Sequence, residues 1–192
     1  MSDWPVEIAG VVESVVTTRG PNDRWNVAAL GLQEPDGDGP VTARTWGRTR
    51  TWRNFRERGG GYVQFTRDPV DFAEAALSIR EEDDPVLDST DAWTRVEVTR
   101  LDSGADGGTQ WVDWALDPVE TTVRAETVPR TNRGYYAVVE ATVAASRLDV
   151  PAYDRERLLD RLAYFEDVAR RCGDDRIQAA FDRVRDLTDA DW

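Results

Sequence analysis

The fold of this chain is decided first by residues 6–32, which read VEIAGVVESVVTTRGPNDRWNVAALGL. Residues 6–16 are rich in β-branched side chains, which favour a strand, and Thr17-Thr18 closes that run. Residues 19–23 read Arg-Gly-Pro-Asn-Asp, the composition of a turn, and a second apolar run follows over residues 25–32. The stretch therefore predicts an antiparallel β-hairpin.

Beyond the hairpin, short strand-like segments alternate with turns and only two early helices. The sequence predicts strands over residues 41–52, 62–66, 93–101, 109–116, 121–128 and 135–145, with a flexible hairpin tip over 102–108. Helices are predicted over 51–58, with Thr51 as N-cap, and from Asp68-Pro69 to Leu77. This pattern favours a mainly β fold with helices (α+β), built as a small antiparallel barrel rather than a parallel sheet.

From Asp154 onward, hydrophobic residues recur with the spacing of an α-helix. Leu158, Leu162 and Phe165 begin an apolar series with spacings of four and three, and Cys172 lies in the same register. Gly173 ends this helix, and a second one follows over residues 177–187. We therefore expect a β-rich body over residues 1–150 and a helical hairpin over residues 151–192, packed on the body or on a partner subunit.

The charge composition indicates adaptation to salt. The net charge is −13, the pI is about 4.5, and every basic side chain is Arg. In molar salt the Debye length falls to about 3 Å, so repulsion within such a surface is screened. We expect a protein of a halophilic archaeon; the alternative is an ordinary acidic protein from a GC-rich genome, which encodes Arg in preference to Lys.

Several classes of site are excluded by composition. The chain has no His and one Cys, so it cannot form a Ser-His-Asp triad, a His-based metal site, a zinc-cysteine cluster or an internal disulfide. We predict no metal, and any redox chemistry would come from a bound cofactor. Neither a signal sequence nor an apolar run of about 20 residues is present, so we expect a cytoplasmic protein without a membrane partner.

Residues 39–55 form a basic island without a single acid. They contain Arg44, Arg48, Arg50 and Arg53 among several threonines, followed by Asn54. Guanidinium groups, hydroxyls and the amides of a helix N-terminus are suited to a phosphate monoester. Two alternatives stay open. The arginines could simply pair with acids on neighbouring strands, or aromatic residues of the island could stack on bases, although one short basic island is not the broad electropositive face of a nucleic-acid-binding protein.

Two further segments are weaker candidates. Asn26, Ala28 and Ala29 follow Thr17-Thr18, and small residues let a flat aromatic ligand approach the backbone, although a tightly packed hairpin explains them as well. The other is Asn132-Arg133-Gly134, which a simple turn would also explain. The acids near the second half of the β-body have the pattern of solvated positions, so no catalytic residue is assigned.

An ordered set of short motifs resembles one protein family. The motifs are Glu13-Ser14-Val15-Val16-Thr17-Thr18, Asn26-Val27-Ala28-Ala29-Leu30-Gly31, Thr49-Arg50-Thr51 with Asn54, Asp68-Pro69-Val70 with Phe72-Ala73, and Asn132-Arg133-Gly134 before Ala137-Val138-Val139-Glu140-Ala141. In this order they resemble the archaeal domain-of-unknown-function 447 family, which looks like a branch of the FMN-binding split β-barrels. Flavin reductases and pyridoxamine-phosphate-oxidase-like proteins are its relatives.

The resemblance implies a homodimer that binds FMN. The residues that would hold the phosphate, by resemblance, are Thr49, Arg50, Thr51 and Asn54, together with neighbouring Arg48. The ring itself would be lined by Thr17, Thr18, Asn26, Val27 and Ala28, and approached by Asn132 and Arg133. The implied function is that of a flavoprotein, as an FMN-dependent oxidoreductase or flavin reductase. The alternatives are a non-catalytic module that binds FMN or another phosphorylated ligand, and an assembly protein whose arginines form salt bridges across a dimer.

Overall fold

The structure, a computed structural model, describes residues 4–192, and these fall into two compact units. The barrel unit holds the chain up to Arg67 together with Arg80–Glu126. The helical unit holds Asp68–Ile79 together with Thr127–Trp192. The second unit therefore begins soon after Glu126 rather than at residue 151, and it also takes up the earlier helix that starts at Pro69.

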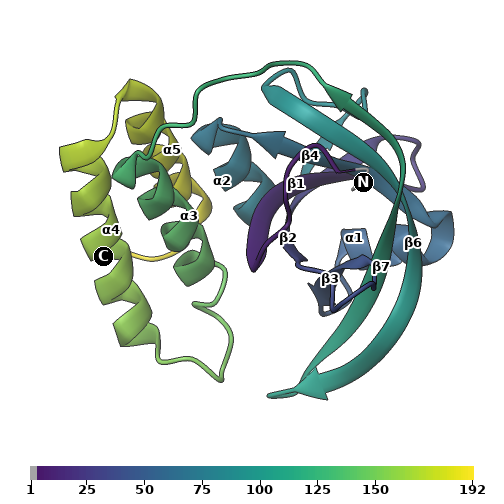
Figure 1. Ribbon diagram of the computed structural model, residues 1–192. Helices are drawn as coiled ribbons and strands as arrows, with labels where there is room; N and C mark the ends of the chain where they lie inside the picture. Colours follow the sequence, from purple (N-terminus) through teal and green to yellow (C-terminus); the bar gives the residue numbers. More distant parts are fainter. Residues whose placement is uncertain (1–3) are drawn as a thin grey trace. The chain divides into compact units, whose positions relative to one another are not determined.

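Within the described residues, six antiparallel strands close into a barrel and a seventh short strand extends it (Figure 1). The order around the barrel is β1, β4, β6, β7, β3 and β2; β2 pairs back onto β1, and β5 adds to β2. The bounds are β1 Val11–Arg19, β2 Trp25–Gln33, β3 Val41–Trp46, β4 Gly60–Thr66, β5 Arg80–Glu82, β6 Thr90–Asp106 and β7 Thr109–Val123. The predicted antiparallel barrel is confirmed.

The first hairpin is confirmed in its pairing. Its register runs without a break from Val11 opposite Gln33 to Arg19 opposite Trp25. The first strand begins later than predicted and includes Thr17 and Thr18. At the turn, Asp23 has a φ of 62°, a left-handed conformation that Asp tolerates better than most residues.

The hairpin of β6 and β7 is longer than predicted, and its register shifts twice, after Arg95 and after Arg100. Pairing continues from Ala92 opposite Val123 to Asp106 opposite Thr109, so most of the expected flexible tip is strand. Gly107 and Gly108, both with positive φ, make the turn. β7 is one strand to Val123, whereas two strands, over 109–116 and 121–128, were predicted. We call residues 99–114 the hairpin arm.

The basic island does not continue as a strand to Trp52, so that prediction was wrong. β3 ends at Trp46, and Gly47 turns the chain with a φ of 70°. Helix α1, Arg50–Arg58, then starts one residue earlier than predicted, and its N-cap is Thr49 rather than Thr51. The arginines of the island consequently do not share one strand face.

Helix α1 contributes to the barrel core. Its Phe55 is 1% exposed, and its ring centroid lies 5.5 Å from that of Trp114 on β7. The indole N–H of Trp114 donates to the Thr45 hydroxyl at 2.9 Å, so this buried polar group is satisfied. The core further includes Val16, Leu30, Leu32, Val41, Ala43, Val63, Val96, Val112 and Leu116.

A buried amide fixes the segment that precedes β6. Gln64 on β4 is 0% exposed, and its Nε2 donates to the Pro85 carbonyl at 2.9 Å and to the Thr17 hydroxyl at 3.1 Å. Its Oε1 accepts from the Leu87 N–H at 2.8 Å and the Thr90 hydroxyl at 2.7 Å. All four hydrogen-bonding positions of the amide are used, which holds the stretch between β5 and β6 against the barrel.

The helical unit consists of four capped helices in the described part of the chain. They are α2 Pro69–Leu77, α3 Arg133–Ala145, α4 Arg155–Cys172 and α5 Asp175–Leu187, with N-caps Asp68, Asn132, Asp154 and Asp174. The predictions for α2 and for the two C-terminal helices are confirmed. Their apolar faces share one core with Val138, Leu162 and Phe181. No helix in residues 4–192 combines the length and apolar character that crossing a bilayer requires.

The predicted strand over residues 135–145 is helix α3, so this assignment was wrong. Tyr135, Val138 and Val139 suggested a strand because aromatic and β-branched residues favour one. The buried positions Ala137, Val138, Ala141 and Ala144 instead follow the spacing of a helix face, and Asn132 caps its start. This helix explains why the helical unit extends further towards the N-terminus than expected.

Candidate ligand-binding site

The start of helix α1 gathers the donors that the sequence assigned to a phosphate. The Thr49 hydroxyl accepts from the Trp52 N–H at 3.2 Å, and Arg50 is the first residue of the helix. The first amides of any helix have no acceptor within it, and its dipole favours an anion there. Arg48 and Thr49 are exposed, whereas Thr51 is buried.

The guanidinium of Arg50 is held by an acid from another element. Its Nη1 donates to Oε1 of Glu81 on β5 at 2.5 Å, and the other carboxylate oxygen accepts from Asn22 Nδ2 at 3.0 Å. The Arg50 side chain is 41% exposed. A guanidinium has five N–H donors, so those of Arg50 not directed at Glu81 remain for a second anion.

Asn54 and Thr18 fasten the helix to the barrel. Asn54 is 1% exposed; its Nδ2 donates to the Thr18 hydroxyl at 3.0 Å and the Thr18 carbonyl at 3.3 Å. Its Oδ1 accepts from Arg53 Nε at 3.3 Å. Thr17 donates its hydroxyl to the Pro85 carbonyl at 2.5 Å. These buried side chains bond within the protein, and they position the N-terminus of α1 beside the end of β1.

Strand pairing brings the remaining candidates of the barrel unit to the same edge. Asn26 on β2 lies opposite Thr18 of β1 on one side and opposite Glu81 of β5 on the other. Val27 is buried opposite Thr17, and Ala28 is half-buried one residue further along β2. The structure thus joins Arg50, Glu81 and the first hairpin into one site, which we call the α1 site.

Asn132 and Arg133 belong to the helical unit, where they begin helix α3. The Asn132 Oδ1 accepts from the Gly134 N–H at 2.8 Å, which makes it the N-cap, and Arg133 is the first residue of the helix. Residue 134 has no room for a side chain, because an added Cβ would lie 2.9 Å from the Gly173 Cα. The local role of this motif is therefore helix capping and close helix packing.

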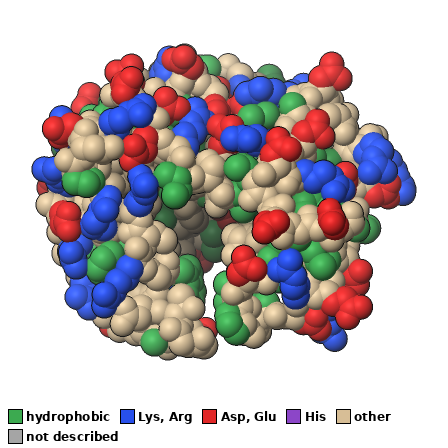
Figure 2. Space-filling model, turned by 180° about the vertical axis from the view of Figure 1, so that it is seen from behind, with side chains coloured by type: hydrophobic (Ala, Val, Ile, Leu, Met, Phe, Trp, Pro, Cys, Tyr) green, Lys and Arg blue, Asp and Glu red, His purple; other side chains and the backbone are tan. Residues whose placement is uncertain are grey.

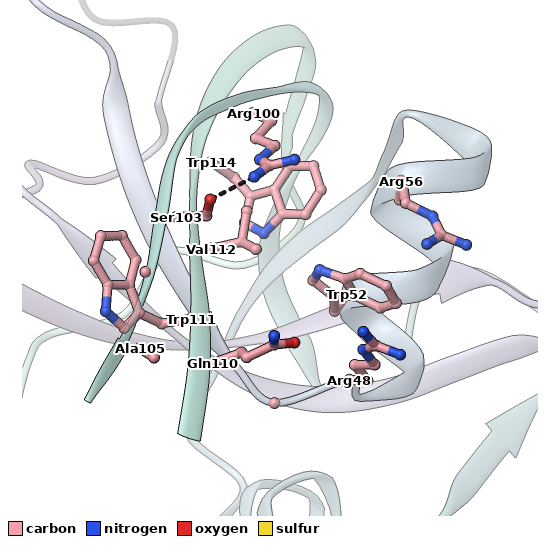
Figure 3. Close-up of a pocket in the computed structure, with 12 residues that line it drawn as sticks. Arg48, Trp52, Arg56, Arg100, Ser103, Ala105, Gln110, Trp111, Val112 and Trp114 are labelled. Atoms are coloured by element: carbon pink, nitrogen blue, oxygen red, sulfur yellow. Dashed lines mark hydrogen bonds between the residues drawn. The ribbon is translucent and has the colours of Figure 1, made fainter. Parts of the chain in front are cut away.

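A cavity of about 480 Å³ lies between helix α1 and the hairpin arm (Figure 3). Arg48, Trp52 and Arg56 line it from α1 and the preceding turn. The hairpin arm contributes Arg100, Ser103, Gln110, Trp111 and Trp114. Figure 3 shows Trp52 and Trp114 on the same side of the arm strands, with Arg100 above and Arg48 below them in this view, and the Trp111 ring on the other side of the strands. We call this space the arm cavity.

One alternative for the basic island was that its arginines pair with acids on neighbouring strands, and this is the case for Arg44. Its Nε and Nη2 each donate to Asp113 at 2.7 Å, and its guanidinium lies 4.0 Å from the Trp111 ring centroid. The hydrogen bonds to Asp113 raise the pKa of the Arg44 guanidinium above its ordinary value. Arg44 is therefore committed to a structural ion pair, whereas Arg48 has neither an ion pair nor a hydrogen bond among the described residues.

Sequence reasoning missed two residues that matter at these sites, Glu81 and Arg100. Glu81 was assigned to no element, and Arg100 was predicted only as part of the strand over residues 93–101. Glu81 has no local signal because its ion pair joins strand β5 to helix α1, 31 residues away in the sequence. No cluster of three potential metal ligands lies together in residues 4–192. The chemistry available at the α1 site is therefore anion binding by cations, a hydroxyl and helix amides.

The fold is a six-stranded split β-barrel joined to a helical C-terminal unit. Residues 12–125 match the family described as "Protein of unknown function (DUF447) N-terminal domain", and residues 132–186 match its second part, "Protein of unknown function (DUF447)". The chain belongs to this family, as its motifs predicted.

Solved structures with similar folds include an FMN-bound protein of the same family from Methanosarcina mazei. It is 23% identical, with a TM-score of 0.78, and the match covers 93% of this chain and 95% of that one. Nitrilotriacetate monooxygenase component B from Bacillus cereus matches at 13% identity, over 64% of this chain and 74% of its own, with a TM-score of 0.46. The protein of that name from Mycobacterium thermoresistibile matches at 18% identity, over 62% and 73%, with a TM-score of 0.41.

Proposed function

We propose that this protein is an FMN-binding flavoprotein whose α1 site holds the phosphate of the cofactor. The observation that carries the proposal is the start of α1, where the exposed Thr49, the helix amides and Arg50 converge. The donor set fits a phosphate monoester, because it offers both hydrogen bonds and positive charge. The FMN-bound relative from Methanosarcina mazei, which has this fold over nearly its whole length, supports the same cofactor.

Several residues would contribute to FMN binding in different ways. Arg50 and Arg48 would neutralise the phosphate, and Thr49 would contribute its hydroxyl while it caps the helix. Thr18 and Asn54 would act indirectly, since their hydrogen bonds fix the helix start. Val27 and Ala28, together with Asn26, would border the ring. Bound FMN would supply the redox chemistry.

The test is retention of FMN by the full chain in concentrated salt. Protein reconstituted with FMN should keep flavin absorbance through a desalting column. Arg50→Ala should weaken binding about ten- to a hundredfold, the size expected for a charge-assisted contact. Arg58→Ala is the matched control, because Arg58 lies in the last turn of the same helix. Loss of the pigment by the parent protein, or equal loss in both variants, would overturn the assignment.

We further propose that the protein is an enzyme, namely a flavin-dependent oxidoreductase or flavin reductase. Oxidation of NADH or NADPH by the reconstituted protein, compared with free FMN alone, tests it. A rate above that of free FMN supports the enzyme. A rate no greater, with FMN still retained, supports a non-catalytic FMN module instead.

The resemblance to dimeric split barrels also leads us to propose a homodimer. Large apolar side chains of the barrel unit are exposed, among them Val11 at 65%, Trp46 at 47% and Val123 at 51%. Such side chains on a barrel surface are suited to contact with a second subunit. Sedimentation velocity in concentrated salt tests this proposal, and a species of 21.6 kDa at all concentrations would contradict it.

A further inference from the structure

The arm cavity combines positive charge with aromatic walls in an otherwise acidic protein. Three arginines and three tryptophans line it, namely Arg48, Arg56, Arg100, Trp52, Trp111 and Trp114, and none of its lining residues is acidic. The whole chain carries 37 acids and a net charge of −13. The absence of acids from this lining therefore makes the cavity a local site for an anion.

Two of the three cations have no carboxylate partner among the described residues. Arg48 comes from the turn before α1, and Arg100 comes from the hairpin arm, where it donates only to the Ser103 hydroxyl. The third, Arg56, rests 4.5 Å from the Trp52 ring centroid and also pairs with its neighbour Glu57 at 3.0 Å. Arg48 and Arg100 thus approach the cavity from opposite walls with their charge available.

The aromatic walls are held in place by contacts outside the cavity. Trp114 is 3% exposed, and its N–H is already bonded to Thr45, so it presents only its ring. Trp111, three residues earlier, points to the opposite face of β7, where its ring packs on Gly104 and lies 4.0 Å from the Arg44 guanidinium. Its ring therefore does not face Trp52 or Trp114. The fixed ring of Trp114 is pre-organised to stack on another planar group.

The cavity is sized for a small molecule. Its volume of about 480 Å³ lies within the range of about 300–1,000 Å³ that is usual for ligand pockets. Asp102, Asp106 and Asp113 lie near enough to act on Arg44 on the opposite face of the arm. Those acids disfavour a long polyanion running along the arm, and they favour a ligand with one anionic group directed at Arg48 and Arg100.

We propose that the arm cavity binds a planar aromatic molecule that carries one anionic group such as a carboxylate. The ring would lie between Trp52 and Trp114, and the anion would take the guanidinium groups of Arg48 and Arg100. Arg48 borders both this cavity and the α1 site, whereas Arg100 belongs to the arm cavity alone, so binding here does not depend on FMN.

The experiment is calorimetric titration of the full chain in concentrated KCl with 2-naphthoate. Two ligand controls remove one feature each: 2-naphthalenemethanol has the ring without the charge, and cyclohexanecarboxylate has the charge without the aromatic ring. Arg100→Gln and Trp52→Leu test the two walls of the site, and both should weaken binding. The matched control is Arg95→Gln, because Arg95 lies on the same strand but pairs with Glu120 at 3.5 Å, away from the cavity.

The proposal expects 2-naphthoate to bind, and both ligand controls to bind at least about tenfold more weakly. Arg100→Gln should reduce affinity by about tenfold, whereas Arg95→Gln should leave it unchanged. Arg100 is exposed on the arm, so its replacement leaves the core intact, as circular dichroism can verify. Absence of binding, or equal binding of the uncharged analogue, would overturn the proposal. The titration is done without FMN, so its result is independent of the retention test.

Discussion

The Arg50 guanidinium donates to the Glu81 carboxylate at 2.5 Å, although 31 residues separate the two in the sequence. The contact exists because β5 adds to the edge of β2 and brings Glu81 opposite Asn26. Glu81 therefore stands at the guanidinium that we assign to the FMN phosphate. An acid in this position competes with the ligand for Arg50, and it also holds the guanidinium in one place.

We expect Glu81→Gln to bind FMN more tightly than the parent protein. The substitution removes a negative charge beside the proposed phosphate and frees Arg50, which should lower the Kd by about three- to tenfold. Titration of flavin fluorescence measures the Kd. Glu82→Gln is the matched control, because Glu82 lies on the same short strand and pairs instead with Arg80 at 2.7 Å. A weaker affinity in Glu81→Gln would mean that the acid mainly orients Arg50.

Thr49 has two roles that substitution can separate. Thr49→Ala removes the N-cap of α1, which should lower the free energy of unfolding by about 1 kcal/mol, and it should also weaken FMN binding. Thr49→Ser retains the hydroxyl and should preserve both properties. Urea denaturation and flavin titration measure the two effects. If Thr49→Ala loses stability but binds FMN normally, the hydroxyl serves only the helix.

The buried amide of Gln64 should be among the most sensitive positions in the barrel unit. Gln64→Leu leaves the buried Leu87 N–H and Thr90 hydroxyl without their acceptor, which should cost about 2–4 kcal/mol in the free energy of unfolding. Gln33→Leu, at the exposed end of β2, is the control and should change stability little. Urea denaturation gives both values. A small effect at Gln64 would mean that water or local movement replaces the lost hydrogen bonds.

How much of the fold follows from sequence is clearest in the two hairpins. The β1–β2 hairpin was predicted because strand residues and turn residues are contiguous there. The hairpin arm was only partly predicted, because Asp102-Ser103-Gly104 has the composition of a loop and is held as strand by its pairing with β7. Helix α3 was missed for a similar reason, since residues typical of strands lie on a helix face that is buried by other helices. In both places, long-range packing determines the secondary structure and overrides the preference of the local sequence.

The candidate site, like the fold, was predicted only in part. Thr49 and Arg50 could be found because a helix N-terminus and a basic island coincide locally. Glu81 and Arg100 could not, because their positions depend on β5 joining β2 and on the length of the β6–β7 pairing. Thr17 and Thr18 were assigned to the ligand, yet their hydroxyls bond within the barrel. The sequence thus indicated the type of ligand better than it indicated which donors remain available.

The Arg44–Asp113 pair should stabilise the barrel evenly across neutral pH. Arg44→Met should lower the free energy of unfolding by about 1–2 kcal/mol, because a bidentate, partly buried ion pair and the stacking on Trp111 are lost. The hydrogen bonds to Asp113 raise the pKa of Arg44 above its ordinary value, so the contribution of the pair is fully present at all pH values below that ordinary value and is lost only in strongly alkaline solution. The loss in Arg44→Met should therefore be the same at pH 6 and pH 9.

Arg95→Met is the control for that measurement. Arg95 pairs with Glu120 at a longer 3.5 Å with both side chains more exposed, so its loss should cost no more than about 0.5 kcal/mol. Urea denaturation at the two pH values compares the variants. A clear decrease in the Arg44 effect between pH 6 and pH 9 would contradict the assignment of a permanently charged guanidinium.

The acidic surface should make folding depend on salt. Figure 2 shows acidic and basic side chains intermixed on the visible face, and over the whole chain the acids outnumber the arginines by 37 to 24. Screening of the remaining repulsion should stabilise the folded state as KCl rises from low to molar concentration, by about 1–2 kcal/mol, or roughly 2–8 °C in Tm. Differential scanning fluorimetry measures this dependence. A double variant, Asp36→Asn with Asp38→Asn, removes two exposed charges from one loop and should have a higher Tm in low salt and a smaller response to KCl. If the two proteins respond equally, stabilisation by KCl does not act through screening of these charges.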